Sequence, residues 1–227
     1  MCTISFFPNQ VEGYLLAMNR DEQHSRPAAT ELRREDGISY PVDPQGGGTW
    51  IGVSDRGMAI TLLNRYSHGQ VDSSKQYKSR GTIIPPLLKM ESLDRVLGSI
   101  QRLDIREFPS FSLVLFDPRE RKVVLFESDG NELISREFGW VPYFLTSSAF
   151  ETQGIISYRK KLFESFLTHF PKIIKDKVVD FHLTQTPGQE ARSILMSQAE
   201  ARTVSFSLIE FWNGKIEFSY HLIPEDF

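Results

Sequence analysis

The single cysteine of the 227-residue chain is Cys2, directly behind the initiator methionine. Methionine aminopeptidases act when the second side chain is small, and after removal of Met1 the residue Cys2 would carry both a thiol and an α-amine. An α-amine has an ordinary pKa of about 7.7–8.0, so it can accept the thiol proton near neutral pH. The position therefore predicts an N-terminal nucleophile. The alternative is a small hydrophobic residue at the start of a strand.

Charged residues are expected to lie beside this thiol. The apolar runs 3–7 and 14–19 flank the turn signal Glu12-Gly13 and predict an antiparallel hairpin. The end of the second run, Asn19-Arg20-Asp21-Glu22, would then return next to Cys2.

These neighbours have types suited to a thiol nucleophile. Asp21 could hold the α-amine in position and tune its protonation. Arg20 could favour the thiolate and orient a substrate carbonyl or carboxylate. The alternative is a solvated charged cluster at the end of a strand, and the cysteine at position 2 favours the catalytic interpretation.

Other residues leave alternatives open. The run Gly46-Gly47-Gly48 is too short for a phosphate-binding loop and favours a tight turn before Trp50, which is either a core residue or a pocket wall. Arg159 is either a charge on a helix face or a buried salt-bridge partner. The histidines lack the spacing of metal ligands, so no metal site is expected.

Composition excludes several classes of function. With 40% hydrophobic and 24% charged residues, the chain is typical of a soluble globular protein. A net charge of −3 gives no electrostatic reason to expect a nucleic-acid partner. No apolar run is long enough to span a bilayer, and the first ten residues lack the pattern of a signal peptide. We therefore expect a cytoplasmic protein with no integral membrane segment.

The order of predicted elements indicates an α+β fold in which helices cover antiparallel sheets, within a single domain over residues 1–227. Hairpins predominate, and Asn213-Gly214 between two β-rich runs is a strong turn signal. Residues 21–45 read as a long loop with at most one short strand. The predicted helices are 80–103 in two pieces broken by Pro85-Pro86, with Ser92 as N-cap of the second piece, then 157–169 and 177–183; the other predicted strands are 49–54, 58–64, 112–116, 122–127, 203–211 and 215–222.

Several short segments, in this order along the chain, resemble the NRDE family, which includes the transport and Golgi organisation protein two of animals. They are Met1-Cys2, Asn19–Glu22, Ser25–Pro27, Gly47–Ser54, Asn64, Thr146–Ser148, Tyr158–Lys160 and Ala201–Ser205. Because these segments span nearly the whole chain, the resemblance is specific.

This family is in turn similar to the N-terminal nucleophile hydrolases, most closely the penicillin V acylase and bile salt hydrolase group. That similarity implies a four-layer αββα sandwich and cleavage of a linear amide. In the hydrolases an arginine usually stands two residues earlier than Arg20, where this chain has Met18.

The resemblance also implies roles for individual residues. Cys2 would be nucleophile and base, Asp21 and Arg20 its assistants, and Asn64 an oxyanion-hole donor, with Ser147 or Ser148 at the place of a second donor. Substrate binding is expected from Asn19, Trp50, Ser148 and Arg202.

Three functions follow as hypotheses. The first is an amidohydrolase acting on carbon–nitrogen bonds other than peptide bonds, with a small-molecule amide as substrate and no cofactor. The second, implied by the family, is a non-catalytic chaperone that carries haem as bound cargo in the same pocket. The third is a structural protein of the secretory pathway. The oligomeric state stays open.

Overall fold

The computed structural model describes residues 2–9, 13–27, 29, 31–66 and 75–224. Within them, two antiparallel sheets face each other. The first sheet has five strands in the order β10-β1-β2-β11-β12. Its strands are β1 (Cys2–Asn9), β2 (Gly13–Gln23), β10 (Tyr143–Ser147), β11 (Ala201–Trp212) and β12 (Lys215–Leu222).

The second sheet has seven strands in sequence order, β3 to β9. It is therefore a meander in which neighbours in the chain are neighbours in space. Its strands are β3 (Leu32–Glu35), β4 (Ile38–Pro41), β5 (Ile51–Ser54), β6 (Ala59–Asn64), β7 (Phe111–Asp117), β8 (Lys122–Ser128) and β9 (Leu133–Phe138).

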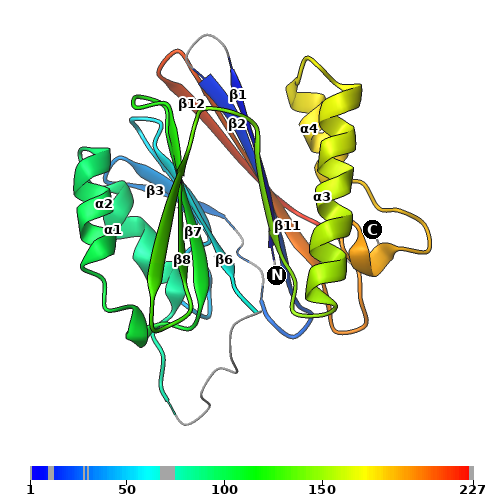
Figure 1. Ribbon diagram of the computed structural model, residues 1–227, viewed down its shortest axis with the longest axis horizontal. Helices are drawn as coiled ribbons and strands as arrows, with labels where there is room; N and C mark the ends of the chain where they lie inside the picture. The colour runs from blue at the N-terminus through cyan, green and yellow to red at the C-terminus, as the bar shows by residue number, and fades with distance from the viewer. Residues whose placement is uncertain (1, 10–12, 28, 30, 67–74, 225–227) are drawn as a thin grey trace.

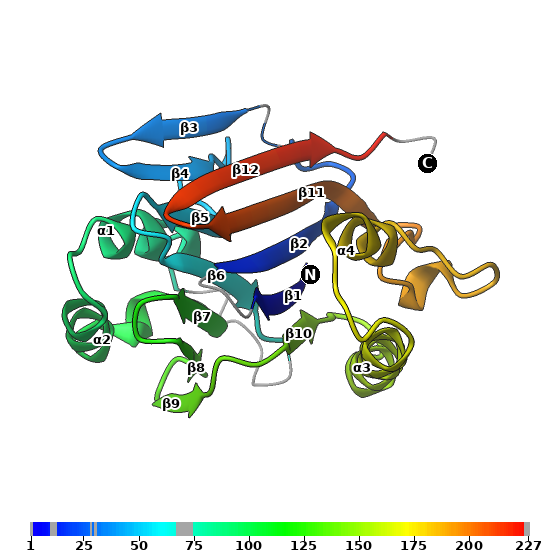
Figure 2. The ribbon, with the colours of Figure 1, turned by 90° about the horizontal axis from the view of Figure 1, so that it is seen from above.

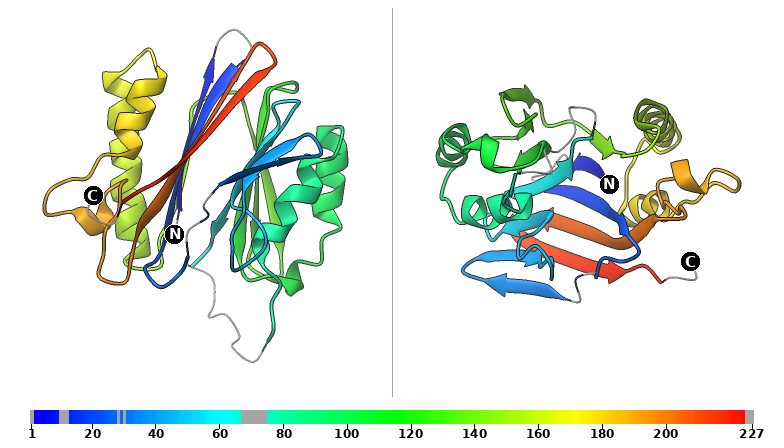
Figure 3. Two further views of the ribbon diagram at one scale, coloured as in Figure 1. Left: turned by 180° about the vertical axis from the view of Figure 1, so that it is seen from behind. Right: turned by 90° about the horizontal axis from the view of Figure 1, so that it is seen from below.

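Helices cover the outer face of each sheet, which gives four layers (Figure 1). α1 (Ile84–Leu88) and α2 (Leu93–Gln101) lie on the seven-stranded sheet. α3 (Thr152–His169) and α4 (Lys175–His182) lie on the five-stranded sheet, as the views from above and behind also show (Figures 2 and 3). The α+β, αββα fold expected from the sequence is confirmed.

Strand alternation explains how one strand serves two layers. Successive side chains of a strand point to opposite faces. In β1, Ile4 and Phe6 join the apolar core between the two sheets, whereas Phe7 joins the core beneath α3 and α4. Both faces of the five-stranded sheet are therefore buried.

Several predicted boundaries were wrong. The segment Asn19–Glu22 lies inside β2, which continues to Gln23, because β11 pairs with it along its whole length. The predicted loop over 21–45 contains the hairpin of β3 and β4. Pro85-Pro86 does not break a helix but occupies the first turn of α1, where a missing backbone N–H costs nothing.

Other predictions were confirmed. Ser92 caps α2 by accepting a hydrogen bond from the backbone N–H of Arg95. Asn213 and Gly214 have φ of 48° and 74°, the left-handed conformation that a tight hairpin turn requires. None of the helices in the described residues combines the length and the apolar character needed to span a bilayer.

Candidate functional site

Cys2 begins β1, between β10 on one side and β2 on the other. It pairs with Ser147 of β10 and with Arg20 of β2. Its backbone N–H donates to Ser147 Oγ at 3.1 Å. The residue is buried, with 8% of its surface exposed. The hairpin thus brings Arg20 beside Cys2, as the sequence predicts.

A cavity of about 320 Å³ opens at this end of the sandwich, and we call it the Cys2 cavity. Its wall combines residues from both sheets with the segment before α1. It is lined by Cys2, Arg20, Asp21, Glu22, Arg26, Asp43, Gly46, Thr49, Trp50, Leu62, Asn64, Tyr77, Lys78, Ser79, Arg80, Gly81 and Pro109.

Arg20 lies on the cavity side of β2 and is almost fully buried. Its guanidinium stacks on the Trp50 ring, with 4.3 Å from Cζ to the ring centroid. Its Nη2 contacts Glu22 at 3.1 Å and Asp43 at 3.2 Å. Arg26 binds the same two carboxylates, at 3.2 Å and 2.5 Å. Two arginines and two carboxylates therefore form one neutral cluster, which fixes the Arg20 side chain.

Asp21 borders the cavity but is held from the helix side. Its Oδ1 accepts a hydrogen bond from Thr203 Oγ1 at 2.7 Å, and its Oδ2 lies 3.4 Å from Arg159 Nη1. Arg159 of α3 is fully buried, and its Nη1 also donates to the hydroxyls of Thr3 and Thr146 at 2.9 and 3.0 Å. Of the two interpretations left open for Arg159, the buried salt-bridge partner is confirmed.

The surroundings of Cys2 favour the protonated form of its thiol. Burial raises its pKa, and the Asp21 carboxylate acts in the same direction, while Arg20 acts in the opposite one. A buried neutral thiol needs a nearby base to become a nucleophile.

Asn64 ends β6, in the other sheet, and lines the Cys2 cavity. Its Nδ2 donates to the Tyr66 hydroxyl at 2.9 Å. An amide nitrogen carries two hydrogens, so one more donor remains on Asn64.

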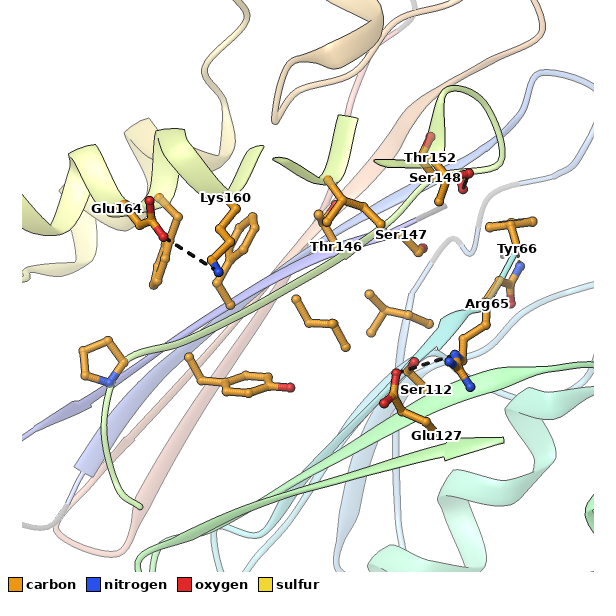
Figure 4. A pocket seen from close by; sticks show the side chains of 18 of the residues that line it. Arg65, Tyr66, Ser112, Glu127, Thr146, Ser147, Ser148, Thr152, Lys160 and Glu164 are labelled. Atoms are coloured by element: carbon orange, nitrogen blue, oxygen red, sulfur yellow. Dashed lines mark hydrogen bonds and ion pairs between the residues drawn. The ribbon is translucent and has the colours of Figure 1, made fainter. Parts of the chain in front are cut away.

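Asn64 also lines a second cavity of about 450 Å³, which runs along β10 and which we call the β10 cavity (Figure 4). Its apolar wall includes Leu63, Tyr143, Phe144, Leu145, Ile156, Phe163 and Leu167. Charged pairs stand at its rim: Arg65 with Glu127, and Lys160 with Glu164. Ser147, the partner of Cys2, lines it too. The two cavities thus share Asn64, and the paired residues Cys2 and Ser147 line one cavity each.

Two residues expected to bind substrate lie elsewhere. Asn19 faces the helix layer, where its Nδ2 donates to the carbonyls of His182 and Ile194, and its Oδ1 is bonded to His182 Nδ1. Arg202 donates to the carbonyls of Thr203, Ile223 and Pro224. Neither residue lines the Cys2 cavity or the β10 cavity. A role of Asn19 and Arg202 in substrate binding therefore stays a prediction, which their contacts in this structure do not support.

The serines divide between two tasks. Ser147 is the one beside Cys2. Ser148 lines the β10 cavity, and its hydroxyl donates to the Phe150 carbonyl while its own carbonyl accepts from Thr152 Oγ1. Ser148 therefore shapes the turn into α3.

Some residues of the Cys2 cavity could not be predicted from local sequence patterns. Asp43 lies in a loop and Arg80 begins the short 3-10 helix Arg80–Ile83, and only the tertiary fold brings them to the cavity that Cys2 lines. Arg26 stands in the family-like Ser25–Pro27 segment, which could have pointed to it. Outside the gaps named above, no three His, Cys, Asp or Glu side chains are grouped closely enough to hold a metal ion.

Two solved structures share this architecture. The N-acylethanolamine-hydrolyzing acid amidase orthologue of Caenorhabditis elegans superposes with a TM-score of 0.63 at 12% identity, over 92% of each chain. The C2A mutant of the conjugated bile acid hydrolase of Clostridium perfringens superposes with a TM-score of 0.53 at 11% identity, over 96% of this chain and 92% of that one. At such identities the likeness establishes the fold, which is that of the N-terminal nucleophile hydrolases.

A search among curated protein sequences found no match. The family model of Transport and Golgi organisation 2 matches residues 1–208, which is most of the chain. The chain therefore belongs to the Transport and Golgi organisation 2 family.

Proposed function

We propose that this protein is an amidohydrolase of linear, non-peptide amides, with Cys2 as nucleophile after removal of Met1. The observation that carries the proposal is the position of Cys2: a buried thiol at the head of a central strand, beside Arg20 and Ser147, in a cavity bordered by Asp21. The hydrolase fold of the two structural neighbours supports it.

The first half of the reaction would use the thiol and, once Met1 is removed, the α-amine of Cys2. The α-amine of Cys2 takes the thiol proton, and Sγ attacks the amide carbon. In the structure the backbone nitrogen of Cys2 donates to Ser147 Oγ, so this serine would orient the amine. The spare N–H of Asn64 would stabilise the oxyanion from the opposite sheet.

The second half regenerates the enzyme. The protonated amine gives its proton to the leaving nitrogen, and the carbon–nitrogen bond breaks to leave a thioester. Water, activated by the same α-amine, then hydrolyses the thioester to a carboxylic acid and the free thiol. Asp21, held by Arg159 and Thr203, would keep the amine in place through both steps.

The β10 cavity is suited to the acyl part of the amide. Its wall is mostly apolar, and it includes Ser147, which accepts a hydrogen bond from the Cys2 backbone, and Asn64, which also lines the Cys2 cavity. Removing an apolar chain from water there is favourable in proportion to the area buried.

Intact-mass spectrometry of the purified protein tests the first requirement, loss of Met1. Hydrolysis of a panel of fatty acyl amides by the wild type and by Cys2→Ser tests the second. We expect a mature chain that starts at Cys2, and a loss of at least about a hundredfold in kcat for Cys2→Ser, because a hydroxyl is far harder to ionise. A chain that keeps Met1, or equal rates for both proteins, would contradict the proposal.

The haem-carrier alternative stays a prediction. Titration of the protein with haem, followed by absorbance, tests it; the absence of a saturable spectral shift would remove it.

A further inference from the structure

Of the described cations that line the Cys2 cavity, three form ion pairs with carboxylates. Arg20 and Arg26 share Glu22 and Asp43, and Lys78 is paired with Glu107 at 2.8 Å.

Asp21, the third acidic residue of the wall, is paired with a cation from the helix layer. Asp21 faces the buried Arg159 at 3.4 Å. Arg80 is the remaining cation of the wall, and the hydrogen bond described for it runs from Nη1 to the carbonyl of Ser110 at 2.9 Å. Within the described part of the chain, Arg80 has no carboxylate in ion-pair contact. One positive charge of this cavity is thus left for a ligand.

Two further donors of the same wall have no acceptor among the described residues. They are Arg20 Nη1 and Trp50 Nε1, and both atoms are buried. Arg20 and Trp50 have exposed fractions of only 3% and 5%. Buried N–H groups are nearly always hydrogen-bonded in native proteins, so a pair of them beside a cavity indicates an acceptor that arrives from outside.

Backbone contacts fix Arg80 close to these donors. The N–H of Thr49, next to Trp50, donates to the carbonyl of Gly81 at 3.1 Å. A Cβ on Gly48 would come within 2.2 Å of the Gly81 carbonyl carbon, and one on Gly81 within 2.7 Å of the Thr49 nitrogen. Two glycines therefore allow the segments that carry Trp50 and Arg80 to touch.

We propose that Arg80, Arg20 Nη1 and Trp50 Nε1 bind a carboxylate on the amine part of the substrate, so that the substrates are N-acyl amino acids. A carboxylate offers two coplanar acceptors, which match a guanidinium. The assignment to the amine part follows from the neighbouring β10 cavity, which takes the apolar acyl part. Burial lowers the pKa of Arg80, as expected for a cation taken out of water without a carboxylate to offset the loss.

This inference rests on the proposed function for the chemistry, and the atoms balance. The N-acyl amino acid and one water molecule give a fatty acid and a free amino acid. The carbon–nitrogen bond breaks, the water oxygen stays on the acyl carbon, and the protons go to the leaving amine. The site itself is a binding site and can be tested without turnover.

The experiment compares N-dodecanoylglycine with N-dodecanoylglycinamide, which has the same size and no charge. For the wild type we expect kcat/KM to favour the carboxylate by at least about tenfold. In Arg80→Met the preference should fall to near one, because KM of the carboxylate substrate rises more than KM of the neutral amide. Arg95→Met, an exposed arginine of α2, is the matched control and should keep the preference. Equal kcat/KM for the two substrates in the wild type would overturn the inference.

A binding measurement distinguishes a failure of the carboxylate site from a failure of the proposed hydrolase function. Calorimetry on Cys2→Ala, with and without Arg80→Met, should show N-dodecanoylglycine binding that weakens at least about tenfold when Arg80 is lost. Such binding without hydrolysis by the wild type would sink the proposed function and leave the carboxylate site standing. Hydrolysis of both amides with no effect of Arg80→Met would do the reverse.

Discussion

Residues 19–21 of β2 contribute to two regions of the molecule, the layer beneath α3 and α4 and the space between the two sheets. The two regions differ in whether their polar side chains have hydrogen-bond partners. Toward the helices, Asn19 and Asp21 are held by partners from α4, α3 and β11. Toward the other sheet, Arg20 keeps a donor without an acceptor among the described residues. The comparison teaches that Asn19 and Arg20, which are adjacent in one strand, divide between building the fold and facing a ligand, because strand alternation sends them to opposite sides. Asp21 is held from the helix side and also borders the Cys2 cavity.

The largest effect is expected from Arg159→Met. The change leaves the Asp21 carboxylate buried without its cation, and breaking a buried pair in this way costs about 3–5 kcal/mol. Urea denaturation should show a free energy of unfolding lower by that amount. Adding Asp21→Asn should recover a large part of it, and a double variant no more stable than the single one would contradict this account.

Asn19→Ala should come next. It removes the hydrogen bonds to His182 and Ile194, and each buried group left unpaired costs about 1–3 kcal/mol. Denaturation measures the loss. If Asn19 acted on substrate instead, kcat would fall in protein that remains as stable as the wild type.

The His182 side chain gives the helix-facing region a pH dependence. Burial lowers its pKa to about 3, from an ordinary value near 6.5, so it is neutral in the folded protein and binds a proton on unfolding. Stability is then fully present above about pH 6.5 and is lost as pH falls from there toward 3, by about 1.4 kcal/mol per pH unit. Unfolding free energies of wild type and His182→Gln between pH 4 and 8 measure it, and parallel curves would contradict it.

The smallest effect on stability is expected from Arg20→Gln. Its two carboxylate partners keep Arg26 and are themselves partly exposed, so we expect a loss of about 1–3 kcal/mol in unfolding free energy, below that of Arg159→Met. Activity on amides should nevertheless fall, because Arg20 faces the cavity. A loss of stability as large as that of Arg159→Met would erase the distinction between the two regions.

Local patterns in the sequence predicted much of what local physics decides. The hairpin that brings Arg20 to Cys2, the Ser92 cap and the Asn213-Gly214 turn all follow from residues near one another in the chain. The resemblance of short segments to a known family supplied the four-layer arrangement.

Other features depend on contacts between distant segments. β10, which supplies Ser147, pairs with β1 across 145 residues, and no residue near β10 in the chain indicates that partner. Asn19 was expected to bind substrate, but the strand that carries it is buried on both faces, so hydrophobic alternation does not reveal which face carries the site. The place of Arg80 depends on a loop contact that no periodicity encodes.

The close contact between Gly48 and Gly81 holds the segment that carries Trp50 against the segment that carries Arg80, in the wall of the Cys2 cavity. Because the two segments are in backbone contact, a movement that widens the Cys2 cavity at this wall would displace Trp50 and Arg80 together. A single methyl group at either glycine would push the two segments apart. Substrate selectivity would then change at this wall while the strands of both sheets stay in place.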